Sequence, residues 1–228
     1  MNYDFLDNPV WHALDSIHHN FALGTDTIKR YPSDILQIMG CKYPETANLN
    51  DAENWVRPKE KLFIVGELTP IPSNWKILHK LECVQTIYPK PVNSSSKTPS
   101  EIVHLNENDR AEMIQLINLV QPGYFNKNTP LLGSYFGIKQ DNKLVAIAGE
   151  RLRMTGFTEI SAVVTHPSFT GKGFAQQLVS HVANKNFNEG ALPFLHFVIT
   201  NERARKVYEL LGFKERKIIP FWQLSATF

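Results

Sequence analysis

The sequence is poor in cysteine, and neither of its two cysteines belongs to a motif. Cys41 and Cys83 stand far apart, in no CxxC pair and near no metal-ligand spacing. A chain of 228 residues can bury about 70% of the surface that its unfolded form exposes, so a disulfide or metal is not needed for stability. We expect two reduced, buried thiols and no metal.

The sequence also lacks a targeting segment and a membrane span. Residues 1–15 are acidic and contain no apolar run, unlike a secretory signal peptide. No stretch approaches the roughly 18 apolar residues that a transmembrane helix needs. We therefore expect a soluble, cytoplasmic protein with no membrane partner.

The sequence also has no large excess of positive or negative residues. The 24 Lys and Arg residues nearly balance the 22 Asp and Glu residues, which gives a net charge of +2. This is too little for a nucleic-acid-binding surface, which needs a clustered basic face. A composition of 43% hydrophobic and 20% charged residues is that of an ordinary globular protein and excludes collagen-like and disordered classes.

Proline is unevenly distributed along the chain. Nine of the 14 prolines fall in residues 1–100, and the segment 89–99 combines Pro, Ser and Asn with few apolar residues. We place a boundary there and predict two parts, residues 1–98 and 99–228. The first part contains no catalytic pattern. Its predicted elements are a helix over 9–22 and strands over 61–68 and 76–88.

The second part shows alternating strand and helix patterns. Phe174, Leu178 and Val182 recur every four residues and predict a helix over 173–188 that is buried on one face. A tight hairpin turn is expected at 140–142. Together the elements predict an α/β layered domain. The other predicted elements are strands over 101–105, 134–140, 143–155, 158–165, 194–200 and 213–223, and helices over 106–120 and 201–211.

Two glycines mark the turn between a strand and the 173–188 helix. Gly171 and Gly173 let the backbone approach a ligand, and the N-terminus of the helix adds a partial positive charge. The loop matches neither the Walker A pattern nor GxGxxG. The arrangement suits a phosphate or pyrophosphate, to which Lys172 adds a point charge, although a simple tight turn would produce the same pattern.

Two motifs together resemble the GNAT superfamily of N-acyltransferases. Residues 170–175 read Thr-Gly-Lys-Gly-Phe-Ala, similar to the acetyl-CoA loop Q/R-x-x-G-x-G/A of that family. Residues 201–213 match the common GNAT ending N-x-x-A-x-x-x-Y-x-x-x-G-F. The resemblance covers about 101–228, and the long leading segment resembles the glycine N-acyltransferase-like branch. It implies a mixed, mostly antiparallel sheet flanked by helices, with residues 1–98 as a degenerate GNAT-like half.

The resemblance also implies acetyl-CoA as the co-substrate and a set of residues that bind it. Thr170 stands where the family has Gln or Arg, so the backbone N–H groups and the Thr hydroxyl are the donors that remain for the pyrophosphate. Asn201 caps the following helix and is expected to contact CoA too. The implied cofactor-binding residues are Val163, Val164, Thr165, Thr170, Gly171, Lys172, Gly173, Phe174, Ala175 and Asn201.

Three residues are candidates for the chemistry of acyl transfer. Tyr208 matches the family tyrosine that protonates the leaving thiolate, and a phenol with a pKa of about 10 can donate at neutral pH. Glu159 falls where several histone-acetylating relatives carry a catalytic glutamate, so it is the expected general base. Glu150 is the alternative; it lies mid-strand, where an acid either contacts substrate or pairs with a nearby arginine.

The sequence therefore favours an acetyl-CoA-dependent N-acetyltransferase. The expected acceptor is a small primary amine, with amino acids among the candidates, and the protein is expected to be a monomer or homodimer. Two alternatives stay open. One is an N-acyltransferase that uses another acyl-CoA or a peptide N-terminus, and the other is a non-catalytic CoA-binding module.

Overall fold

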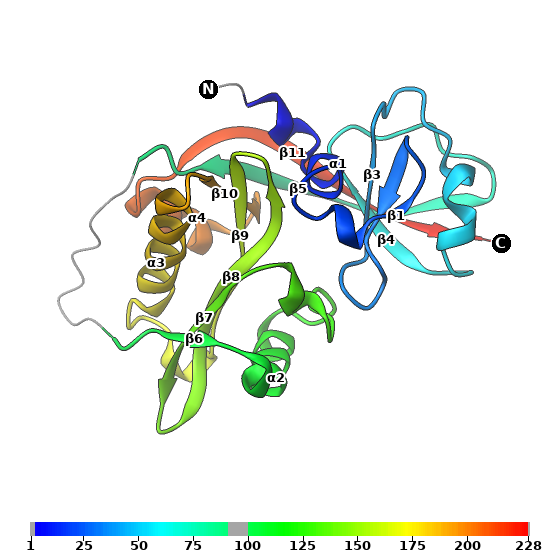
Figure 1. The fold of residues 1–228 in the computed structure, drawn as a ribbon. Coiled ribbons are helices and arrows are strands. Elements are labelled where there is room, and N and C mark those ends of the chain that lie inside the picture. The colour runs from blue at the N-terminus through cyan, green and yellow to red at the C-terminus, as the bar shows by residue number, and fades with distance from the viewer. Residues whose placement is uncertain (1–2, 91–99, 228) are drawn as a thin grey trace.

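A computed structural model describes residues 3–90 and 100–227, whose strands form one continuous sheet (Figure 1). Most of the expected boundary segment 89–99 lies outside the described residues, and the division into two parts stays a prediction. The strand order is β1-β2-β3-β4-β11-β5-β10-β9-β8-β7-β6. Neighbouring strands are antiparallel except for β3–β4 and β9–β10. This confirms the predicted mixed, mostly antiparallel sheet.

The strands come from both parts of the chain. Those before the boundary segment are β1 (Leu23–Gly24), β2 (Ile28–Arg30), β3 (Ile38–Cys41), β4 (Lys61–Val65) and β5 (Trp75–Ile87). Those after it are β6 (Val103–Leu105), β7 (Tyr135–Gln140), β8 (Lys143–Met154), β9 (Phe157–Thr165), β10 (Leu192–Val198) and β11 (Lys214–Ala226).

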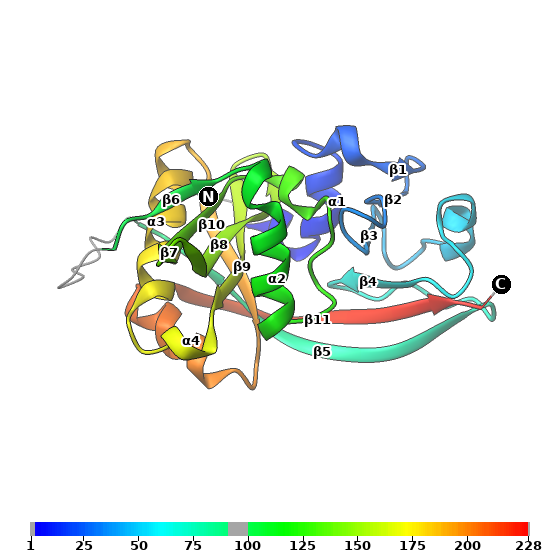
Figure 2. The same ribbon diagram turned by 90° about the horizontal axis from the view of Figure 1, so that it is seen from below.

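Two long strands, β5 and β11, carry the sheet from one part to the other (Figure 2). They pair with each other from Lys214↔Ile87 to Ala226↔Trp75. At one end β5 also pairs with β10, and at the other end β11 also pairs with β4. The N-terminal strands are therefore joined to the rest of the molecule by the main-chain hydrogen bonds of a single sheet.

The helices cover both faces of the sheet. They are α1 (Pro9–Leu14), α2 (Arg110–Val120), α3 (Phe174–Asn188) and α4 (Glu202–Leu210). The neighbouring residues Val163 and Val164 on β9 pack into different clusters, the first with α3 and the second with α2. Because successive strand residues point to opposite faces, α2 and α3 lie on opposite sides of the sheet.

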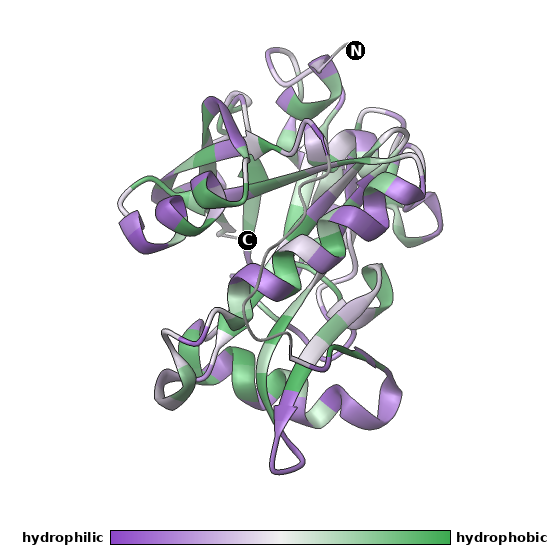
Figure 3. Ribbon diagram, turned by 90° about the vertical axis from the view of Figure 1, so that its left-hand side faces the viewer, coloured by the Kyte–Doolittle hydropathy of each residue, from purple (hydrophilic) through white to green (hydrophobic). Residues whose placement is uncertain are grey.

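Local sequence explains most element boundaries. Asp141 and Asn142 adopt positive φ angles of 50° and 60°, as a two-residue hairpin turn requires, so the predicted turn is confirmed. This β7–β8 turn is the hydrophilic tip at the bottom of Figure 3. The helix expected over 9–22 is shorter, because the chain turns after Leu14 and the His18 ring reaches Tyr31 and the carbonyl of Leu132.

No helix among the described residues has both the length and the apolar character needed to cross a bilayer.

Candidate functional site

The glycine loop, residues 166–173, connects β9 to α3. Gly171 and Gly173 have φ angles of +80° and +75°, a left-handed conformation that glycine adopts without strain. Among the described residues, no side chain caps the first amides of α3. Those N–H groups remain available to an anion at the positive end of the helix. Phe174 is buried and Ala175 half-buried, so these two side chains anchor the helix below the loop.

The polar side chains of this loop contact the loop itself. The Thr170 hydroxyl donates to the Pro167 carbonyl over 3.1 Å. The Lys172 ammonium lies 4.8 Å from the centre of the Phe169 ring. Both side chains are exposed. The backbone amides are therefore the principal donors that this loop offers to a phosphate.

Beside the loop, β9 separates from β10. The pairing of the two parallel strands stops at Glu159, although both strands continue. Ala162 has a φ angle of +53° and lies at a break in the register with β8, which is the geometry of a β-bulge. Val163 lines a cavity, while Val164 and Thr165 pair with β8. The separation leaves main-chain groups of β9 free to pair with an extended ligand.

Asn201 and Tyr208 lie on the other side of this gap. The Asn201 side chain caps α4 by accepting a hydrogen bond from the Ala204 amide over 3.0 Å, and both Asn201 and Tyr208 line the cavity. The Tyr208 ring packs 5.5 Å from that of Phe197, measured between ring centres. Burial raises the pKa of Tyr208, so its hydroxyl stays protonated and can donate.

The cavity has a volume of about 310 Å³ and is lined by both parts of the chain. We name its two regions after the ligands proposed for them, the cofactor end and the acceptor end. The cofactor end is lined by Val163, Asn201, Ala204 and Tyr208. The acceptor end is lined by Leu36, Phe63, Cys83, Arg151 and Phe221.

The segment 121–132, after α2, closes the acceptor end. It carries Tyr124 and Phe125 into the cavity wall, and the Tyr124 ring lies 6.2 Å from that of Phe63. Three hydrogen bonds donated by side chains of this segment help to fix it to the N-terminal part: Asn126 Nδ2 to Ser33 O (3.2 Å), Asn128 Nδ2 to Asp34 Oδ2 (2.7 Å) and Thr129 Oγ1 to Ile35 O (2.6 Å). The acceptor end is therefore a walled pocket built from both parts of the chain.

Glu159 lies beneath the cavity and does not line it. Its carboxylate accepts hydrogen bonds from Arg151 Nε (2.8 Å), Arg151 Nη2 (2.6 Å) and His196 Nδ1 (2.7 Å). Burial alone would raise the pKa of Glu159, but Arg151 and His196 outweigh it and lower the pKa to about 2. Glu159 therefore stays ionised at neutral pH and is a weak proton acceptor.

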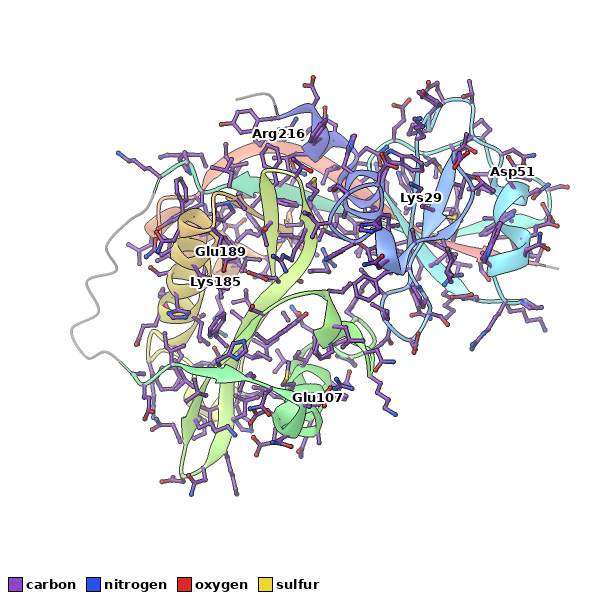
Figure 4. The ribbon with its side chains drawn as sticks, viewed as in Figure 1. Lys29, Asp51, Glu107, Lys185, Glu189 and Arg216 are labelled. Carbon is purple, nitrogen blue, oxygen red and sulfur yellow. The ribbon has the colours of Figure 1, made fainter. Side chains whose placement is uncertain are left out.

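Glu150 is also fully buried, but it faces α3. Its carboxylate accepts hydrogen bonds from Lys185 Nζ and the Ser134 amide, each over 2.9 Å. Lys185 also pairs with Glu189 one turn along α3 (Figure 4). Glu150 does not line the cavity. The structure thus separates the two candidate bases, and Glu159 is the one connected to the cavity, through Arg151 and His196.

Sequence reasoning did not select Arg151 or His196 as site residues. His196 is the only polar residue in the otherwise apolar strand segment 194–198, and such an isolated polar residue was a signal for a site. The sequence offers Arg151 only as one of the nearby arginines that could pair with Glu150. Its actual partner, Glu159, lies across the β8–β9 hairpin.

Metal-ligating side chains do not cluster in the part of the chain that the structure describes. No group of three or more His, Cys, Asp or Glu residues there could hold a metal ion. Cys41 and Cys83 are free and buried, and burial raises their pKa values to about 12 and 11. Neither thiol is activated as a nucleophile.

Comparison with known proteins finds matches at the level of family and fold. A family model described as FR47-like protein matches residues 135–221, which include the glycine loop, α3, Asn201 and Tyr208. None of the curated proteins matches the chain.

Several solved structures share the fold along most of their length. A protein from Novosphingobium aromaticivorans, assigned to the GNAT acetyltransferase family, is 27% identical and superposes with a TM-score of 0.88 over 98% of this chain and 99% of its own. A GCN5-related N-acetyltransferase from Kribbella flavida is 13% identical, with a TM-score of 0.63 over 98% and 94%. A GCN5-related N-acetyltransferase-like protein from Streptococcus suis is 11% identical, with a TM-score of 0.60 over 93% and 92%.

The match to the Novosphingobium protein includes the N-terminal strands as well as the part that carries the glycine loop. The chain has the GNAT fold, and the FR47-like match together with this full-length similarity supports its placement in the GNAT superfamily of acetyltransferases.

Proposed function

We propose that this protein is an acyl-CoA-dependent N-acetyltransferase that uses acetyl-CoA to acetylate a small primary amine. The observation that carries the proposal is the cavity, which runs from Val163, Asn201 and Tyr208 to a pocket lined by both parts of the chain. One end has the groups expected to hold the co-substrate, and the other end has room for an acceptor. We extend the proposal to the glycine N-acyltransferase-like branch, because a leading part that walls the acceptor end agrees with that resemblance.

The residues present fit an acyl-CoA. The uncapped amides at the start of α3 are suited to the pyrophosphate, with Gly171 and Gly173 allowing close approach. The unpaired main chain of β9 beyond Glu159 is suited to the pantetheine arm. The Asn201 side-chain amide has no hydrogen-bond acceptor among the described residues and is available to the same ligand.

When bound, the acyl-CoA supplies the thioester carbon that the amine attacks. In the proposed reaction the amine nitrogen forms a bond to this carbon, the carbon–sulfur bond breaks, and Tyr208 gives its proton to the departing thiolate. An amide of the bulged strand β9 stabilises the negative charge that develops on the carbonyl oxygen. The reaction needs no enzyme nucleophile, in agreement with the raised pKa of Cys83.

The acceptor amine must lose a proton before or during the attack. Glu159 stays a predicted base, but its ion pair with Arg151 makes it a weak one. Glu150 is directed toward Lys185 on the far side of β8. Glu159→Gln distinguishes the role of a base from that of a residue that positions Arg151.

A small acceptor is favoured over a peptide because segment 121–132 bounds the acceptor end on one side. The hydrogen bonds between segment 121–132 and residues 33–35 join the walls on both sides of the pocket. A peptide N-terminus would need an open groove along which the rest of the chain could leave.

The test combines calorimetry with CoA and a thiol-release assay with acetyl-CoA and a panel of primary amines. We expect CoA to bind and at least one small amine to release the thiol. The absence of CoA binding at millimolar concentration would refute the proposal. Binding without turnover on any amine would favour the CoA-binding module instead.

Tyr208→Phe tests the assigned acid. We expect kcat to fall about 10-fold or more, in the usual range for the loss of general acid catalysis. Tyr43→Phe is the matched control, because Tyr43 is 52% exposed and does not line the cavity. An unchanged kcat in Tyr208→Phe would remove this residue from the mechanism.

A further inference from the structure

Arg151 leaves part of its hydrogen-bonding capacity unused. Its Nε and Nη2 atoms donate to Glu159. Its Nη1 atom has no hydrogen-bond partner among the described residues, and the atom is not sealed from solvent. The side chain is 17% exposed and forms part of the cavity wall. Unused guanidinium donors therefore lie at the acceptor end.

A second buried arginine shows what a purely structural pair looks like in this fold. Arg30 pairs with Glu60 through Nη1 (2.9 Å) and Nη2 (2.5 Å). Its Nη1 also donates to the Trp55 carbonyl, and its Nε donates to the Tyr31 carbonyl, each over 2.9 Å. All three nitrogens of Arg30 are therefore engaged. Arg151 differs because its Nη1 atom has no hydrogen-bond partner among the described residues and its side chain lines the cavity.

A chain of hydrogen bonds fixes the orientation of Arg151. Glu159 accepts from His196 Nδ1, so the other ring nitrogen of His196 accepts from Gln85 Nε2 over 3.0 Å. Gln85 is itself oriented, because its Nε2 donates to the Leu6 carbonyl (2.7 Å) and its Oε1 accepts from Arg216 Nη1 (2.9 Å). Arg216, labelled in Figure 4 beside the N-terminal segment, pairs with Asp7. An arginine held in this way binds a ligand without first losing side-chain freedom.

Apolar and aromatic side chains surround these donors. The Arg151 guanidinium lies 5.9 Å from the centre of the Phe221 ring. The apolar side chains of the acceptor end are Leu36, Ile38, Phe63, Phe125 and Phe221. The pocket therefore combines an apolar wall with one oriented group of cationic donors.

We propose that Arg151 binds a carboxylate of the acceptor, so that the substrate is an amine carrying both a carboxylate and an apolar side chain. This inference rests on the proposed function. A guanidinium matches the two oxygens of a carboxylate in plane, with Nη1 and the second hydrogen of Nη2 as donors. Glu159 and His196 are positioning residues: they hold the guanidinium in place and do not contact the acceptor.

The first test compares acids with their amides on the unaltered protein. The pairs are L-phenylalanine with L-phenylalaninamide and L-leucine with L-leucinamide. We expect kcat/KM and equilibrium binding to favour each acid by about 10- to 100-fold, the range of one charge-assisted hydrogen bond. The amide has the less basic amine and so the larger reactive fraction, which means that a preference for the acid reports binding. An amide that binds or reacts as well as its acid would overturn the inference.

The second test removes the charges in matched pairs. In Arg151→Gln/Glu159→Gln we expect the acid-to-amide ratio of kcat/KM to fall to one or below, with CoA binding retained. The control is Arg30→Gln/Glu60→Gln, in which the same change is made in a buried pair away from the cavity, and the ratio should stay at the wild-type value. The acid-to-amide ratio of kcat/KM does not depend on the fraction of folded enzyme, so a loss of stability does not change it. Arg151→Lys, which keeps a cation beside Glu159, should give an intermediate ratio.

The outcomes separate this inference from the proposed function. If CoA does not bind, the proposed function fails. If CoA binds and phenethylamine or the amides are acetylated as well as the acids, the function stands and the role of Arg151 is refuted. An acid-to-amide ratio that survives in Arg151→Gln/Glu159→Gln would also refute it.

Discussion

Two buried arginine–glutamate pairs, one in each part of the chain, differ in what they leave unused. In Arg30–Glu60 the side chains are 2% and 6% exposed, and every guanidinium nitrogen has a partner. In Arg151–Glu159 the side chains are 17% and 1% exposed, and one nitrogen has no partner among the described residues. The guanidinium nitrogens of the first pair all bond within the protein, whereas the second pair presents donors to a cavity.

The comparison teaches that burial of an ion pair does not by itself indicate a function. Both pairs hold a glutamate whose pKa is lowered, because the arginine outweighs the cost of burial. The difference lies in the remaining donors and in the neighbouring space. Every nitrogen of Arg30 has a partner, whereas Arg151 has one that does not among the described residues, so the hydrogen bonds distinguish the two pairs where burial does not.

The largest effect is expected when one partner of either pair is removed. Glu60→Gln and Glu159→Gln should each lower the free energy of unfolding by about 3–5 kcal/mol, because each leaves an uncompensated buried arginine. Urea unfolding monitored by fluorescence measures this loss. A loss below 1 kcal/mol in either variant would contradict the assignment of that pair as buried and coupled.

The same variants separate a base from a positioning residue. In Glu159→Gln a lost base would lower kcat for acids and amides alike, whereas a lost positioning residue changes KM for the acids and leaves kcat for the amides near the wild-type value. Glu60→Gln should leave kcat and KM of the folded enzyme unchanged, because neither Arg30 nor Glu60 lines the cavity.

A smaller effect is expected from acid. Both glutamates stay ionised below neutral pH, so the main loss of stability should come from His18. This residue joins the N-terminal part to segment 121–132 through hydrogen bonds to Tyr31 and Leu132. Burial lowers the pKa of His18 to about 4, against about 6.5 when unfolded. Below pH 6.5 the unfolded chain binds a proton that the folded chain does not, so stability falls as the pH falls toward 4.

Between pH 7 and pH 5 the protonation of His18 in the unfolded chain should lower the free energy of unfolding by about 2 kcal/mol. Urea unfolding at the two pH values measures it. His18→Gln, which keeps a donor for the Leu132 carbonyl, should remove most of the pH dependence. An equal pH dependence in wild type and variant would place the titrating group elsewhere.

The smallest effect concerns the contact that closes the acceptor end. Thr129→Val removes the hydrogen bond that the hydroxyl donates to the Ile35 carbonyl and the one that it accepts from the Asn126 amide, and should cost about 2 kcal/mol of stability. We also expect KM for the acceptor to rise more than KM for acetyl-CoA. Thr86→Val is the matched control, because the buried Thr86 hydroxyl has no hydrogen-bond partner in the structure as described. Equal losses in the two variants would refute the role of this contact.

Much of the fold could be predicted because its signals are local. The stripe of Phe174, Leu178 and Val182 fixes the buried face of α3, and Asp141 and Asn142 fix the β7–β8 turn. The predicted cofactor-binding residues also depend on local signals. The glycine loop and the Asn201 to Tyr208 segment are short motifs whose residues are neighbours in sequence.

The acceptor end could not be predicted in the same way. Arg151, Cys83 and Phe221 come from three different strands, and Leu36 and Phe63 come from a part of the chain with no catalytic pattern. Only the register of the sheet brings them together. The partner of Glu159 was missed for the same reason, because a bulge shifts the pairing of β8 and β9 between Glu150 and Arg153.

The path of β11 has a consequence for the order in which the protein can fold. Leu224, near the end of this strand, pairs with Leu62 on β4, while Lys214 pairs with Ile87 on β5. A chain leaving the ribosome holds β1–β5 long before the strand that joins β4 to β5 has been made. Contacts so distant in sequence close slowly. Until β11 arrives, the facing edges of β4 and β5 lack their partner, and exposed edges of this kind invite association with other chains.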